Sequence, residues 1–145
     1  MNRITRLQFL NSFNSIAAKI HETAIMKGWW DQKTAEDWMQ EIAGNGKIYS
    51  LIEAFEAGQA NPERNKGEMI SLMHSELTEC LEALRAGNPK DDKIPGHSGM
   101  AAELADTIIR IMDFDIAFGI GVANALIAKI EYNETRPYKH GGKKF

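Results

Sequence analysis

Apolar residues recur at three- and four-residue steps along most of the chain, a spacing that predicts amphipathic helices rather than strands. Three of these runs stop at a glycine (Gly28, Gly58 and Gly87), and helices commonly end at glycine. Pro62 stands where a proline can open the following helix. We expect helices at about 5–27, 34–43, 47–57, 63–86, 100–118 and 122–133.

Composition supports an all-α fold. The chain holds one valine beside 17 alanines, which favours helices over sheets. Its 145 residues are enough for one domain with one core, and no repeat, low-complexity segment or linker divides them. We therefore expect residues 1–145 to form a single bundle of four to five helices.

Two acidic residues on the helix expected at 63–86 stand beside its apolar stripe. Glu76 and Glu79 lie three positions apart and therefore share one helix face. Turning about 100° per residue places both next to apolar side chains and puts Glu82 on the opposite, polar side. Carboxylates are rarely buried without a partner, and a metal ion is one partner that satisfies them.

A second acidic pair, Glu103 and Asp106, lies on the next helix. Apolar residues cover most of this helix, as is typical of a buried one, and leave a narrow polar stripe that also contains Arg110 and Asp113. If the helix is buried, the stripe faces a site. The alternative is that the stripe is its only face in contact with solvent, and the helix alone does not separate the two.

The spacing between the two pairs allows them to meet. Twenty-three residues separate Glu79 from Glu103, and antiparallel packing would bring the pairs to within about 6 Å along the helix axes. Four carboxylates this close repel each other unless divalent cations lie among them, and all-oxygen ligation suits Mg²⁺ or Mn²⁺. A di-iron bundle is excluded because it needs Glu-x-x-His on two helices, and neither His74 nor His97 follows a glutamate at that spacing.

With these residues in place, the chain resembles the MazG-like all-α nucleoside triphosphate pyrophosphohydrolases. Their signature is E-x-x-E and, after a gap, E-x-x-D, which here falls at 76–79 and 103–106. The segment 129–143 resembles the K-x-x-x-N-x-x-R-P stretch and basic tail of several members. The motif-bearing core is thus 63–136, followed by a basic tail at 137–145.

The resemblance implies hydrolysis of a (deoxy)nucleoside triphosphate to the monophosphate and pyrophosphate, which clears non-standard or surplus nucleotides. It implies that Glu76, Glu79, Glu103 and Asp106 hold Mg²⁺, and that Glu76 or Glu79 orients the attacking water. Some members carry a further glutamate directly before the first ligand, but this chain has Ser75 there, so the general base stays open. The resemblance also implies a homodimer or homotetramer.

Basic residues near the C-terminus are candidates for phosphate binding. Lys129, Asn133 and Arg136 are spaced to share one helix face, and lysine and arginine both suit phosphate. The alternative is a solvated basic helix end that complements the helix dipole. Lys143, behind two glycines in the tail, either closes over the triphosphate or belongs to a disordered end.

Trp29 and Trp30 are candidates for stacking on the nucleotide base, with a role in the core or a subunit interface as the alternative. Four polar residues of the first helix are further candidates to reach a base or a phosphate, but nothing in their spacing selects among Asn11, Asn14, Lys19 and His21.

The formal net charge of −3 conceals an uneven distribution. Residues 129–145 hold five basic and two acidic residues, whereas 1–128 hold 12 basic and 18 acidic. No polybasic feature favours nucleic acid or an anionic membrane, but a basic end suits a triphosphate. A single cysteine, no signal-like start and no apolar run of about 20 residues predict a soluble cytoplasmic protein.

Two other classes of function stay open on the sequence alone. A helical module could bind metal and nucleotide without cleaving them, and Ser75 in place of an acid favours this alternative. A purely structural bundle would show no response of its melting temperature to Mg²⁺.

Overall fold

The computed structural model describes residues 3–30 and 64–137, and every helix or strand in these two ranges is an α-helix. The all-α prediction is therefore confirmed for them. The helices expected at 34–43 and 47–57, the turn at Pro62, and the tail that contains Lys143 lie outside the described residues. The described helices are α1 (Arg3–Met26), α4 (Lys66–Arg85), α5 (Gly99–Phe118) and α6 (Val122–Glu134).

Side-chain caps set where the second and third of these helices begin. Asn65 accepts hydrogen bonds from the backbone N–H groups of Gly67 and Glu68, at 2.8 and 3.2 Å, so α4 starts a few residues after the expected 63. Ser98 caps α5 in the same way. Gly119 adopts a left-handed conformation with φ +59° and ends α5, as its position after an apolar run predicts.

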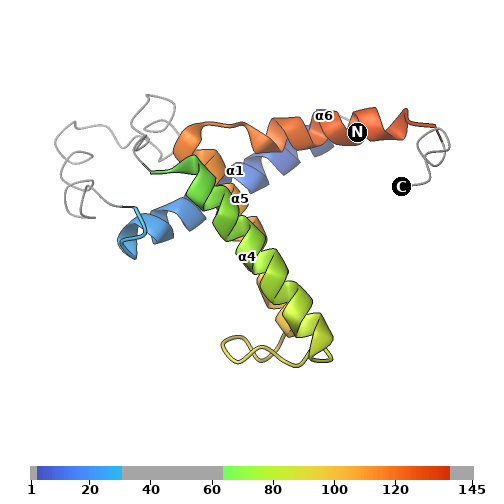
Figure 1. Ribbon diagram of the computed structural model, residues 1–145. Coiled ribbons are helices and arrows are strands. Elements are labelled where there is room, and N and C mark those ends of the chain that lie inside the picture. The colour runs from blue at the N-terminus through green and yellow to red at the C-terminus, as the bar shows by residue number, and fades with distance from the viewer. Residues whose placement is uncertain (1–2, 31–63, 138–145) are drawn as a thin grey trace.

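The helices form two antiparallel pairs that cross (Figure 1). α4 and α5 pack along each other as a hairpin, and α1 packs across α5 and also lies beside α6. α6 leaves α5 at an angle of 117° and runs along α1, where Arg6 meets Glu131 at 3.8 Å. Among the described helices none is long and apolar enough to cross a membrane alone; α5 and α6 reach that composition only when taken together across their bend.

The junction of the two pairs holds a small hydrophobic core. Ala24 from α1, Trp30, Met69 from α4 and Ala117 from α5 are buried there, with Phe114, Phe118 and Ile25 packed around them. This core fixes the end of α1 against the hairpin. It lies beside the polar groups described below.

The apolar surface of α5 is only partly buried within the chain. Leu104 and Ile108 are 44% and 53% exposed, because the described α4 and α1 cover only two sides of the helix. The polar stripe of α5 is not its solvated face either. Arg110 and Asp113 in that stripe bond to side chains of α4 and α1.

Candidate functional site

Three carboxylates meet in the α4–α5 hairpin. Glu76 of α4 and Glu103 and Asp106 of α5 each place an oxygen within 4.8 Å of the others. Glu76 is buried at 6% exposure, Glu103 is half-buried and Asp106 is exposed. Antiparallel packing therefore brings three of the four residues of the two acidic pairs together, at the level expected from the spacing.

The fourth expected ligand, Glu79, lies one turn further along α4 and is exposed. Its carboxylate has no hydrogen-bond or ion-pair partner among the described residues. Glu82 is also exposed and pairs with Arg85 at the far end of the helix, as expected of a solvent residue.

The charges of this cluster act on Glu103. Partial burial raises the pKa of the Glu103 carboxyl above its ordinary value of 4.5, and the negative charges of Glu79, Glu76 and Asp106 raise it further. The protein alone thus disfavours the fully ionised cluster. A divalent cation would remove this repulsion.

The donor set fits Mg²⁺ or Mn²⁺ in its chemistry. The three grouped atoms are all carboxylate oxygens, which hard cations prefer, and their mutual separation of at most 4.8 Å allows one ion to contact all three. The exposed Asp106 leaves room for water or phosphate on the open side. These observations support the cluster as a candidate metal site.

An arginine on α5 balances part of the acidic charge. Arg110 donates from Nε to Oε1 of Glu76 at 2.5 Å, and the side chain of Glu76 is 8% exposed. Burying a carboxylate requires such a partner. Arg110 stands one helical turn after Asp106, so it connects the cluster to the next turn of α5.

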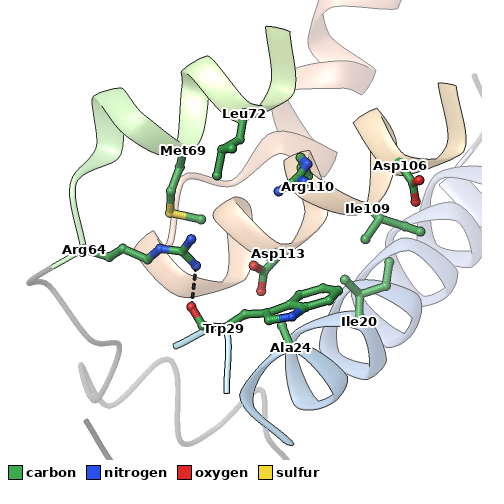
Figure 2. Close-up of a pocket in the computed structure, with 10 residues that line it drawn as sticks. All are labelled: Ile20, Ala24, Trp29, Arg64, Met69, Leu72, Asp106, Ile109, Arg110 and Asp113. Atoms are coloured by element: carbon green, nitrogen blue, oxygen red, sulfur yellow. Dashed lines mark hydrogen bonds between the residues drawn. The ribbon is translucent and has the colours of Figure 1, made fainter. Parts of the chain in front are cut away.

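A pocket of about 410 Å³ adjoins the cluster between α1, α4 and α5 (Figure 2). Asp106 and Arg110 belong to its wall, so cluster and pocket share a boundary. Its other walls are mainly apolar, apart from Arg64 and Asp113. The lining residues are Ile20, Ala24, Trp29, Arg64, Met69, Leu72, Asp106, Ile109, Arg110 and Asp113.

The two tryptophans have different positions. Trp29 is 57% exposed and lines the pocket, and its carbonyl accepts a 2.6 Å hydrogen bond from Nη1 of Arg64. Trp30 is 6% exposed and belongs to the core. Only Trp29 therefore has a ring free to meet a ligand, whereas Trp30 fits the alternative of a core aromatic.

In the pocket wall, Asp113 is held by His21 of α1 and by Trp30, which follows that helix. Nε1 of Trp30 donates to both of its oxygens, at 3.1 and 3.0 Å, and the imidazole of His21 contacts Oδ1 at 2.5 Å. A carboxylate that is ionised only accepts, so such a contact requires the tautomer of His21 that has its proton on Nδ1. All three residues are buried, and His21 thus ties α1 to α5 rather than reaching for a ligand.

The basic residues expected to bind phosphate are not gathered at this cluster. Lys129, Asn133 and Arg136 lie on or just after α6, are exposed, and follow that helix away from the hairpin (Figure 1). Lys129 instead stands over the ring of Tyr132, at 5.2 Å. Among the described residues of one chain, the cation that bonds to a carboxylate of the cluster is Arg110, from the pocket wall.

Sequence reasoning missed the parts played by Arg64 and Asp115. Arg64 precedes α4, and nothing in the local pattern connects it to Trp29. Asp115 accepts from the N–H groups of Gly121 and Val122, at 2.7 and 3.0 Å, and so caps α6 from within α5. The sequence signal for this cap is an aspartate a few residues before a pair of glycines.

Comparisons of the chain with protein-family models, with curated proteins and with solved structures found no match.

Proposed function

We propose that this protein hydrolyses a (deoxy)nucleoside triphosphate to the monophosphate and pyrophosphate with the help of Mg²⁺, as in the clearing of unwanted nucleotides. The observation that carries the proposal is the position of Asp106, which belongs both to the acidic cluster and to the pocket wall. A cation at the cluster would therefore adjoin the pocket. Triphosphate and base need two such neighbouring sites.

The pocket has the mixed lining that a nucleotide requires. Apolar side chains of α1 and α4 and the exposed ring of Trp29 suit a flat base. Arg64 and Arg110 supply positive charge at two places in the wall for acceptor groups of the ligand. A pocket for a purely apolar ligand would have no need of two guanidinium groups.

In this proposal Glu76, Glu103 and Asp106 hold the metal, with Glu79 as a further ligand or as the base. Mg²⁺, when bound, offsets the negative charge that makes a triphosphate resist nucleophilic attack. Water attacks the α-phosphorus, the bond from that phosphorus to the bridging oxygen breaks, and pyrophosphate leaves. We assign to Glu79 the acceptance of the water proton, because its exposed carboxylate has no partner among the described residues.

The test is incubation of the protein with a panel of NTPs and dNTPs and Mg²⁺, with release of monophosphate and pyrophosphate as the readout. Glu79→Gln removes the proposed base and should lower turnover by about 10²-fold or more. Glu82→Gln is the matched control, since Glu82 is an exposed glutamate of the same helix that pairs with Arg85 and lies outside the acidic cluster. No turnover of any nucleotide by the folded protein would rule the proposal out.

One observation favours a second candidate, a module that binds metal and nucleotide without cleavage. Ser75 stands where some relatives of the resembled family carry an acid, and its hydroxyl donates to the backbone carbonyl of Leu72 at 2.7 Å. It is therefore not available as a base. Triphosphate binding by calorimetry, with the ligand recovered intact, would support this candidate over the enzyme.

We further infer that the chain self-associates. Four large apolar side chains form an exposed stripe along α4, and Leu104 and Ile108 are exposed on α5. Single exposed apolar residues are ordinary on a monomer, whereas a contiguous exposed apolar stripe is typical of a surface that contacts another protein chain. Sedimentation or light scattering should show a dimer or tetramer in solution. The double variant Leu77→Glu, Leu81→Glu should shift the oligomeric state toward the monomer. The stripe on α4 consists of Ile70, Leu77, Leu81 and Leu84.

A further inference from the structure

Arg110 has one edge of its guanidinium group engaged and one edge open. Its Nε donates to Glu76, which fixes the side chain beside the acidic cluster. Its two terminal amino groups make no hydrogen bond to any described residue. The side chain is 39% exposed, so these groups are accessible although the Nε edge is fixed.

The open edge adjoins the pocket. Arg110 belongs to the pocket wall one turn after Asp106, and Figure 2 shows it across the pocket from Arg64. Arg64 is held on its own side by the Trp29 carbonyl and by the ring of Trp30, 5.2 Å from its guanidinium carbon. Of the two arginines, only Arg110 therefore touches both a carboxylate of the cluster and the pocket.

Guanidinium chemistry suits this position. The group has five N–H donors in one plane, and the pair on its two terminal nitrogens matches two oxygens of a phosphate. The single nitrogen of a lysine cannot hold Glu76 and two phosphate oxygens in this way. The α6 cations lie away from the cluster (Figure 1), so this contact has no substitute among them in one chain.

We propose that Arg110 binds the phosphates of the substrate through its terminal amino groups while its Nε keeps Glu76 in place. This inference rests on the proposed function, because it takes the cluster as the site where the triphosphate is held. Arg110 would then link the proposed metal-binding carboxylates to the phosphate anhydride. Arg110 thus has a binding role toward the ligand and a positioning role toward Glu76.

The experiment is calorimetric titration of inorganic pyrophosphate into the protein in the presence of Mg²⁺. Arg110→Gln should weaken pyrophosphate binding by about tenfold or more, because a charge-assisted bidentate contact is lost. Arg110→Lys should recover only part of the affinity. Arg85→Gln is the matched control, since Arg85 is also an arginine paired with a glutamate of α4, and it should stay within about twofold of the parent.

Unchanged affinity in folded Arg110→Gln would overturn the inference, and so would absence of pyrophosphate binding by the parent protein. If Arg110→Gln does not fold, Arg110→Lys decides, because it keeps a cation beside Glu76: weakened binding supports the inference and parental binding overturns it. A purely structural role would lower the melting temperature of Arg110→Lys and leave its pyrophosphate affinity unchanged.

The inference and the proposed function fail in different ways. Pyrophosphate binding is measured without turnover, so a loss in Arg110→Gln supports the inference even if no nucleotide is cleaved. Conversely, normal turnover by Arg110→Gln with an unchanged KM overturns the inference and leaves the proposed function standing. When the parent is active, a rise in KM larger than the fall in kcat is the expected pattern.

Discussion

The two halves of α5 carry carboxylates in opposite situations. In the first half, Glu103 and Asp106 face Glu76 across the hairpin and are surrounded by like charge, so that the pKa of Glu103 is raised. In the second half, Asp113 and Asp115 are more deeply buried, at 7% and 6% exposure, yet each accepts hydrogen bonds from fixed donors.

This difference separates acidic residues that support the fold from those that could hold a metal ion. Among the described residues no buried side-chain nitrogen or oxygen lacks a hydrogen-bond partner, so the second half of α5 is satisfied by the protein alone. At the first half, the one described carboxylate of the cluster with a cationic partner is Glu76 of α4, which pairs with Arg110, while Glu103 and Asp106 of α5 repel each other. Like-charged carboxylates that a fold holds close together, despite their repulsion, are typical of functional sites.

The largest effect should come from a carboxylate of the first half. Asp106→Asn removes a proposed metal ligand that also lines the pocket, and it should lower the proposed nucleotide hydrolysis by about 10²-fold or more. Because Asp106 is exposed, the variant should keep its helicity and its stability without metal. The added measurement is the melting temperature with and without Mg²⁺, whose metal-dependent rise should disappear.

Asp92→Asn, in the exposed loop between α4 and α5, is the control for this variant. If Asp106→Asn retained both the parental turnover and the Mg²⁺-dependent rise, the first half of α5 would have no more functional role than the second.

In the second half, the largest effect should fall on stability. Asp113→Ala leaves the buried donors of Trp30 and His21 without their acceptor and should lower the free energy of unfolding by about 2–4 kcal/mol. Asp113→Asn keeps one acceptor oxygen and should cost less. Urea denaturation measures both, and a loss below about 1 kcal/mol for the alanine variant would contradict the assignment of Asp113 to the fold.

The sequence predicted the helices and the positions of their carboxylates better than it predicted which distant residues those carboxylates contact. Periodicity located α1, α4, α5 and α6 within a few residues, because apolar spacing and glycine stops are local properties. The number of residues between Glu76 and Glu103 also predicted that they lie close together along the hairpin axis, because helix rise and loop length set the antiparallel register. The prediction of a metal site followed from this register.

Contacts between distant segments could not be predicted in the same way. Trp30 and Asp113 are 83 residues apart, and only the packing of α1 across α5 brings them together. For the same reason the helical spacing of Lys129 and Arg136 aligned them on one face without showing that α6 turns away from the hairpin. Local spacing identifies a face of a helix, whereas the angle between helices decides what that face meets.

A smaller loss of stability is expected from the cap at the end of α5. Asp115→Ala removes the acceptor for two N–H groups at the start of α6 and should cost about 1–2 kcal/mol. The loss should concentrate in α6, so hydrogen exchange of its first amides should accelerate more than that of α4. Uniform acceleration across both helices would argue against a local cap.

The smallest effect should be the dependence of metal-free stability on pH. The pKa of Glu103 is raised in the folded protein from 4.5, so the unfolded chain loses this proton first as the pH rises. Since the folded state then binds more protons, its stability falls as the pH rises above 4.5 and levels off above the raised pKa. Glu103→Gln should remove this fall and should be slightly more stable than the parent near neutral pH without metal. Unfolding by urea at a series of pH values, with Glu134→Gln of α6 as the control, measures the difference. Parallel stability curves for the parent and Glu103→Gln would show that the first half of α5 tolerates its charges as well as the second half does.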